Sequence, residues 1–260
     1  MRRLTIYYLA TTLKKYNIQA TDDQLGHVKD IYFDDKYWTV RYLVVDTSKW
    51  LPSKKVLLSP ISLDKVDSEN KAVNVLTSKE TVKSAPHKKE NEPISKQYEI
   101  DLAGYYEIPI YWSGTGPWSG FPTPAALGLA DKQKMIQSKN ATSQEDNNYL
   151  RSVNEVRGEL TGYTVEGIGG KIGYVFDVII DDSNWKINYL VVETSKFLAA
   201  NYILVATDWI NDVQWQDKNI YVEVDSVKAK NVTDYDIHAH ITKEYEDKLY
   251  SALGKNRNSI

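Results

Sequence analysis

Short runs of apolar and β-branched residues, separated by polar turns, make up most of the chain. Residues 26–33 and 40–46 are two such runs, and the acidic pair Asp34-Asp35 lies between them. Runs of this length around a polar turn predict a β-hairpin. Further short strands are predicted at 16–18, 55–58, 63–66 and 72–76.

The same pattern occurs twice. Shifting the sequence by 147 residues aligns 13–102 with 160–249 without a gap, and 26 of the 90 positions are identical. This tandem duplication predicts a mainly β fold of two small, six-stranded antiparallel β-barrels. The predicted domains are barrel 1 with a trailing helix (1–103), a connector and linker (104–149) and barrel 2 with a C-terminal helix (150–260).

Each predicted barrel is followed by a short helix. Ser95 and Thr242 stand at the N-cap positions, and Tyr98 and Leu102, four residues apart, share one helix face that we expect to pack on the barrel. The N-terminus resembles a targeting signal, with two Arg before an apolar run. Because residues 4–16 have an internal counterpart at 151–163, we expect them to be the first element of barrel 1 and the protein to be cytoplasmic.

An unrepeated segment joins the two copies. Residues 105–124 combine aromatic side chains with Gly and Pro and predict an ordered loop, whereas 131–148 read as a polar linker. Exposed Tyr and Trp residues often dominate binding surfaces. The candidate interaction surface is Tyr105, Tyr106, Tyr111, Trp112, Trp118 and Phe121. The favoured interpretation of this segment is a clasp that holds two barrels or two protomers together. A surface that binds a partner or ligand and a mobile loop are the alternatives.

Composition narrows the classes of function. The chain has no Cys, which excludes disulfides, thiolate catalysis and Cys-based metal sites. Its 32 basic and 35 acidic residues are interspersed, so we expect no nucleic-acid partner. No run approaches the roughly 18 apolar residues that a membrane-spanning helix needs. The excess of 19 Tyr and 7 Trp over 4 Phe favours strands and interfaces.

The repeated block resembles a known family. A strand with Gly and Asp, the turn Asp34-Asp35, Trp38 and the run Arg41–Pro60 resemble the PRC-barrel. The whole chain resembles the stand-alone bacterial group in which two such barrels are joined by a Tyr/Trp/Gly-rich connector, here residues 104–118. That family includes the cytoplasmic domain of the photosynthetic reaction-centre H subunit and a domain of a ribosome-maturation factor. The resemblance implies the barrel fold, but it transfers neither activity. Copy one departs from the family pattern by having Asp22-Asp23 where copy two has Gly169-Gly170.

Acidic residues recur at equivalent positions in both copies. They are Asp30, Asp34 and Asp35 in the first and Asp177, Asp181 and Asp182 in the second. Such carboxylates suit a hard cation or a proton relay, but Asp also bonds its own backbone in turns, and the structural interpretation is favoured. The pair His238 and His240 lacks an obvious third ligand. We therefore predict no metal, no cofactor and no catalytic residue.

The apolar runs at 42–45 and 189–192 indicate strands covered on both faces. One face fills the barrel, and the other must meet a helix, the sister barrel or another protomer. The candidate packing or oligomer positions are Tyr42, Val44, Tyr189 and Val191.

These observations predict a non-catalytic scaffold or adaptor that acts through an unidentified protein partner and self-associates, as a dimer. One alternative is an accessory factor like the H subunit, docked peripherally at a membrane electron-transfer complex and assisting proton transfer. Another is a small-molecule binder that uses a cleft between the barrels.

Overall fold

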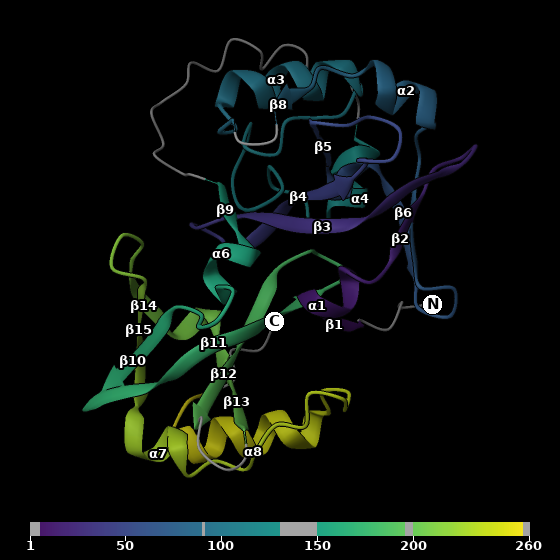
Figure 1. Ribbon diagram of the computed structural model, residues 1–260. Coiled ribbons are helices and arrows are strands. Elements are labelled where there is room, and N and C mark those ends of the chain that lie inside the picture. The colour runs from purple at the N-terminus through teal and green to yellow at the C-terminus, as the bar shows by residue number, and fades with distance from the viewer. Residues whose placement is uncertain (1–5, 90–91, 131–149, 196–199, 257–260) are drawn as a thin grey trace. The chain divides into compact units, whose positions relative to one another are not determined.

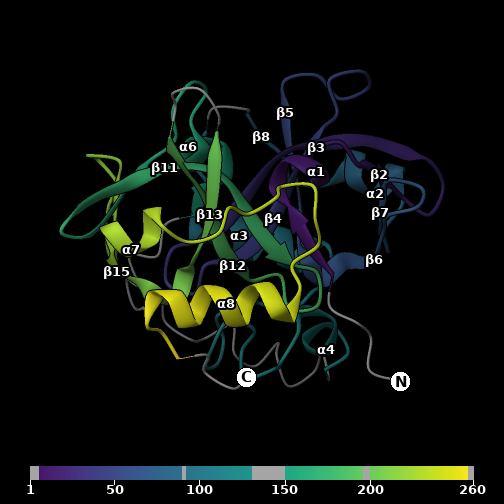
Figure 2. The same cartoon turned by 90° about the horizontal axis from the view of Figure 1, so that it is seen from below.

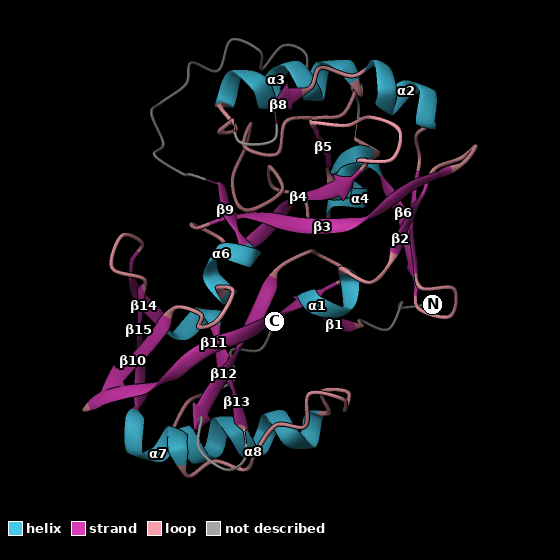
Figure 3. Cartoon of the chain, in the orientation of Figure 1, coloured by secondary structure: helices cyan, strands magenta, loops and turns pink. Residues whose placement is uncertain are grey.

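The computed structural model describes residues 6–89, 92–130, 150–195 and 200–256 (Figure 1). Strands dominate these residues, and the helices are short (Figure 3). The mainly β prediction is confirmed, as are the six strands expected in each repeat. In the first repeat they are β2 (Asn17–Gln19), β3 (Gln24–Asp34), β4 (Thr39–Asp46), β5 (Lys54–Leu58), β6 (Leu63–Asp67) and β7 (Ala72–Val75). In the second they are β10 (Thr164–Ile168), β11 (Gly170–Asp181), β12 (Ile187–Ser195), β13 (Asn201–Ala206), β14 (Ile210–Gln214) and β15 (Asn219–Asp225).

The two repeats form sheets of the same strand order. The first runs β6-β7-β2-β3-β4-β5 and continues to β8 (Lys88–Lys89), and the second runs β14-β15-β10-β11-β12-β13. Among the described strands, neither path of hydrogen bonds closes into a ring, so the closed barrels expected from the sequence are open sheets here. The expectation of purely antiparallel pairing was wrong, because β2 pairs with β7, and β10 with β15, in parallel. The physical reason is the turn η1 (Pro60–Ser62): it separates β5 from β6 and carries the β6–β7 hairpin to the other edge, beside β2.

Each sheet also receives one short strand from the other repeat. The N-terminal strand β1 (Tyr7–Leu9) pairs with β11, with Tyr8 opposite Ile180. Strand β9 (Leu150–Ser152), which precedes the second repeat, pairs with β3, with Arg151 opposite Phe33. Phe33 and Ile180 are equivalent at the offset of 147, so the exchange is reciprocal and uses equivalent positions of β3 and β11. We expected the N-terminal segment to be the first element of barrel 1. Strand β1 instead pairs with β11 of the second repeat.

The compact units of the chain reflect this exchange. The first-repeat unit comprises Thr11–Ser152 and the hairpin tip Asp182–Lys186. The second-repeat unit comprises the described residues of Met1–Ala10, Val153–Asp181 and Ile187–Ile260. Each unit thus contains residues from both repeats and departs from the contiguous boundaries predicted at 103/104 and 149/150.

Local residue choices repeat with the fold. A Cβ at Gly26 would collide with the carbonyl oxygen of Asp46, and one at Gly173 would collide with that of Glu193, so the long hairpin needs glycine at this close approach in both copies. Trp38 and Trp185, at the ends of the two hairpin turns, adopt positive φ values of 52° and 61°. Both rings are buried, which compensates for an unfavourable backbone conformation.

Helices cover the outside of each sheet. The trailing helices α3 (Lys96–Tyr105) and α8 (Lys243–Leu253) begin where expected, because the hydroxyl of Ser95 accepts from the backbone N–H of Tyr98 and that of Thr242 from the N–H of Tyr245. Figure 2 shows α8 lying along its sheet. The other helical segments are α1 (Ala10–Leu13), α2 (Lys79–Ser84), α4 (Pro124–Gly128), α6 (Val153–Arg157), α7 (Ser226–Lys230) and η3 (Thr207–Trp209).

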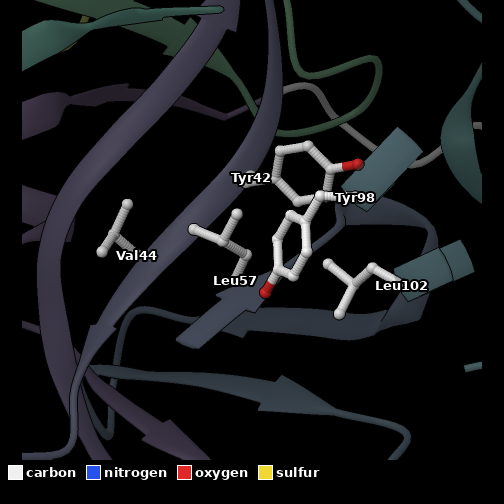
Figure 4. Close-up of a cluster of buried hydrophobic side chains, with 5 residues drawn as sticks. All are labelled: Tyr42, Val44, Leu57, Tyr98 and Leu102. Carbon is white, nitrogen blue, oxygen red and sulfur yellow. The ribbon is translucent and has the colours of Figure 1, made fainter. Parts of the chain in front are cut away.

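The outer face of β4 packs against α3. Tyr98 and Leu102 of the helix form a buried cluster with Tyr42, Val44 and Leu57 (Figure 4). In the second repeat the Tyr189 hydroxyl donates to Glu246 of α8 at 2.6 Å, and Val191 is fully buried. Of the three coverings left open by the sequence, the trailing helix is the one found. Tyr42, Val44, Tyr189 and Val191 are therefore not available as an oligomer surface.

Deletion of residues 2–9 tests the strand exchange. Removing β1 leaves the backbone of 179–181 without its partner, and we expect hydrogen exchange there to accelerate by about tenfold or more. Hydrogen-exchange mass spectrometry of the full-length and shortened chains measures this. Residues 32–34, which pair with β9, serve as the internal control, and acceleration there in place of 179–181 would contradict the exchange.

Candidate functional site

The aromatic connector folds onto the first-repeat unit. Trp118 is fully buried and Tyr111 nearly so, whereas Tyr105, Tyr106, Trp112 and Phe121 are half-buried. Two hydroxyls hold the loop closed, since Ser119 Oγ bonds the carbonyl oxygens of Ile110 and Tyr111 and also lies 3.1 Å from Ser113 Oγ. The predicted interaction surface is thus divided into a buried half and a half-exposed rim.

A buried arginine organises the inner half of the connector. The Arg41 side chain is 1 % exposed, and its Nε donates to Asp34 Oδ2 at 2.8 Å. Its Nη1 donates to the carbonyl oxygen of Pro117. The guanidinium carbon lies 3.9 Å from the ring centroid of Tyr111 and 4.6 Å from that of Trp118. A guanidinium stacked on two rings and paired with a carboxylate has its charge well compensated.

Arg41 was not among the residues nominated from the sequence. A signal for it exists, because it is the one charged residue in the apolar run 40–45, and the second copy has Asn188 at the equivalent position. A charge inside a strand buried on both faces requires dedicated partners. The unrepeated connector supplies them.

The connector also holds the tip of the β11–β12 hairpin, which belongs to the same unit. Trp118 Nε1 donates to the carbonyl oxygen of Asn184 at 2.8 Å. The neighbouring Trp185 carbonyl accepts from the backbone N–H of Val40 at 2.8 Å. The inner half of the connector therefore fastens the hairpin tip 182–186 within the first-repeat unit, and we call these contacts the clasp. A clasp between barrels or protomers, as drawn from the sequence, stays a prediction.

A buried carboxylate lies beside this clasp. Glu99 of α3 is 2 % exposed and accepts from the hydroxyls of Tyr42 at 3.1 Å and Tyr111 at 2.9 Å, while Lys96 Nζ lies 3.2 Å away. Burial raises the pKa of Glu99 above its usual value of 4.5, against the opposing effect of Lys96. Burial likewise raises the pKa of both tyrosines. The second copy has the same kind of bond, between Tyr189 and Glu246. The Tyr–Glu bond therefore docks the trailing helix on its sheet in both copies.

The repeated acidic residues are bonded within the fold. Asp34 accepts from the backbone N–H of Tyr37 as well as from Arg41. Asp30 accepts from Ser152 Oγ at 2.6 Å and Asp35 from Arg151 Nε at 3.0 Å, so both hold the exchanged strand β9.

The second-repeat acids occupy similar surroundings. Asp177 lies 3.3 Å from Arg157 Nε and accepts from the N–H of Val178, and Asp181 and Asp182 are buried.

Within the described residues, no three His, Asp or Glu side chains gather as the ligands of a metal would. His238 and His240 lie in an exposed turn after Asp236, not on an extended strand. Over the same residues, no helix combines the length and apolar character needed to cross a bilayer.

Comparison with known proteins identifies the first repeat. Residues 6–82 match the family model of the PRC-barrel domain. A search of curated proteins found no match.

Substitution Trp118→Ala tests the clasp. It removes a fully buried indole, its hydrogen bond to Asn184 and one face of the Arg41 stack, so we expect a loss of about 3–5 kcal/mol in unfolding free energy. Urea denaturation followed by far-UV circular dichroism measures it. The matched control is Trp112→Ala in the same loop, where half-burial predicts a loss of about 1 kcal/mol. Equal losses for the two variants would argue against the clasp.

Glu99→Gln tests the buried carboxylate through its pH dependence. A carboxyl group whose pKa is raised on folding gives its full stabilisation below the pKa of the unfolded chain, near 4.5, and loses it as pH rises through the folded value. The Gln variant cannot ionise, so it should gain stability relative to the natural protein as pH rises from about 4 to 8. Urea denaturation across this range measures the difference, and a difference independent of pH would refute the assignment.

Proposed function

Residues 6–82 are a PRC-barrel domain, and from that premise we propose that the chain is a non-catalytic scaffold or adaptor that works through protein contacts in the cytoplasm. The observation that carries this proposal is the division of the connector. Its inner aromatic residues and the nearby carboxylates are committed to the fold, while its outer aromatic residues stay half-exposed.

The outer rim has the chemistry of a protein-binding surface. Trp112 stands edge-on to Tyr111, with ring centroids 4.6 Å apart, and carries Lys96 Nζ 3.9 Å from its own centroid. Phe121 lies in the same loop, and its backbone N–H donates to the carbonyl oxygen of Trp118. Rigid, half-exposed aromatic side chains lose little entropy on binding and are enriched in hot spots. Trp112, Phe121 and Lys96 are the residues that we propose to meet the partner.

Tyr105 and Tyr106 contribute less to this surface. The Tyr105 hydroxyl donates to the carbonyl oxygen of Thr81, and Tyr106 packs against the cluster of Figure 4. Both are better described as supports for the rim than as contacts for a partner.

Three further functional predictions remain open. Dimerisation remains a prediction that must use a surface other than the outer faces of β4 and β12, because the trailing helices cover them. The accessory role in proton transfer and the small-molecule site also remain predictions. The acids nominated for a proton path, Asp30, Asp34 and Asp35, are bonded within the first-repeat unit.

Partner capture with matched variants tests the adaptor function. The immobilised full chain is exposed to a lysate of its host, captured proteins are identified, and the affinity of each is remeasured with purified partner. Truncation of central aromatic contacts costs about 2 kcal/mol or more, so Trp112→Ala with Phe121→Ala should weaken binding by roughly thirtyfold. Leu160→Ala, which alters a fully exposed apolar residue elsewhere, should leave binding unchanged. Capture that is indifferent to the double variant would reject this surface.

A further inference from the structure

The corner where the β10–β11 turn meets helix α7 differs in chemistry from its counterpart in the first repeat. Figures 1 and 2 show the tip of the β10–β11 hairpin close to α7. Ile168 is the pairing partner of Asp225, which caps α7, and a Cβ on Gly169 would lie 3.5 Å from Ser226 Oγ. The turn and the first residues of the helix are therefore direct neighbours.

In the first repeat this corner is polar and closed. Lys79 at the start of α2 donates its backbone N–H to Asp22 at 2.7 Å and its Nζ to Asp23 at 2.6 Å. Thr21 and Glu80 are the other two polar residues of this corner. An ion pair and an N–H bond thus tie the turn to the helix.

In the second repeat the equivalent corner is apolar and basic. At the offset of 147, Ile168 replaces Thr21, Gly169-Gly170 replaces Asp22-Asp23, and Val227 replaces Glu80. Ile168 is 63 % exposed and Val227 66 % exposed. The same fold tolerates Thr and Glu at these two positions, so the exposed Ile and Val are not required by packing.

Three lysines lie close in sequence to the two apolar side chains. Lys228 and Lys230 of α7 are exposed, and neither makes an ion pair within the described parts of the chain. Lys171, after the turn, is half-buried with its Nζ 3.2 Å from the ring centroid of Tyr174. The acidic residues nearby have partners of their own. Asp225 caps α7, and Glu223 lies 3.7 Å from Lys255 Nζ. Glu166 is the strand partner of Lys171.

We propose that this corner, formed by Ile168, Val227, Lys228 and Lys230, docks on the surface of an anionic lipid bilayer. Apolar side chains at a protruding turn enter the headgroup boundary, and lysines beside them are attracted to anionic lipids. The corner of the first repeat, with Thr21 and Glu80 at the equivalent positions, lacks these apolar side chains. The site is separate from the rim at Trp112 and Phe121, so either proposal can fail without the other.

Co-sedimentation of the full chain with vesicles tests the proposal. The probes are vesicles of phosphatidylcholine alone and vesicles with added phosphatidylglycerol. We expect binding to the anionic vesicles, and the double variant I168T/V227E should lower the partition coefficient by about tenfold or more. It places the first repeat's own residues at exposed positions, so circular dichroism and thermal unfolding should match the natural protein.

Two controls locate the effect. Leu160→Thr changes a side chain that is 97 % exposed in the same unit, away from the corner, and should leave binding intact. The pair K228Q/K230Q should weaken binding to anionic vesicles by about fivefold or more at low salt, because each lysine adds to the attraction.

Three outcomes would overturn the proposal: no binding to anionic vesicles, equal binding to both vesicle types, or binding that I168T/V227E leaves unchanged. Light scattering of the natural protein and the double variant tests the alternative that the corner binds a second copy of the chain. A loss of mass in the variant, without vesicle binding by the natural protein, would assign the corner to self-contact and reject the lipid surface.

Discussion

The buried guanidinium of Arg41 is the interaction on which the first-repeat unit depends. A charge removed from water is strongly unfavourable unless it is paired and hydrogen-bonded. Arg41 obtains a carboxylate from Asp34, a carbonyl oxygen from Pro117 and two ring faces from Tyr111 and Trp118. These partners come from a hairpin turn and from a connector some seventy residues further along the chain. Satisfying one arginine therefore fixes where the connector lies.

Some contacts occur in both copies and others in the first copy alone. The Tyr–Glu bond that docks the trailing helix occurs in both, as Tyr42 with Glu99 and Tyr189 with Glu246. Arg41 has no counterpart, since Asn188 occupies its place, and the connector that pairs with it is also unrepeated. The duplicated contacts maintain the fold, whereas the unduplicated ones build the clasp and leave an aromatic rim beside it.

Local signals in the sequence were sufficient for most of the fold. The strands, the hairpin turns and the caps at Ser95 and Thr242 depend on neighbouring residues, and duplication showed each signal twice. The parallel strand pairs were missed because they depend on how η1 redirects the chain, which no local pattern records. The exchanged strands are three residues long, too short for a periodic pattern, and their partners are distant in sequence. At the candidate site, the aromatic residues and a possible clasp were recognised, but Arg41, around which Tyr111 and Trp118 pack, was not.

The reciprocal exchange gives the duplication a physical meaning. Strand β1 completes the second sheet and β9 completes the first, so neither copy supplies every strand of its own sheet. In two separate chains, each exchange would require association and its entropic penalty. Joining the copies makes both steps intramolecular, at an effective concentration set by the connecting segment. The cost of closing a loop grows only slowly with its length, so a long connector preserves most of this advantage. The connector could therefore acquire the aromatic clasp and its exposed rim without weakening the link that the exchange requires.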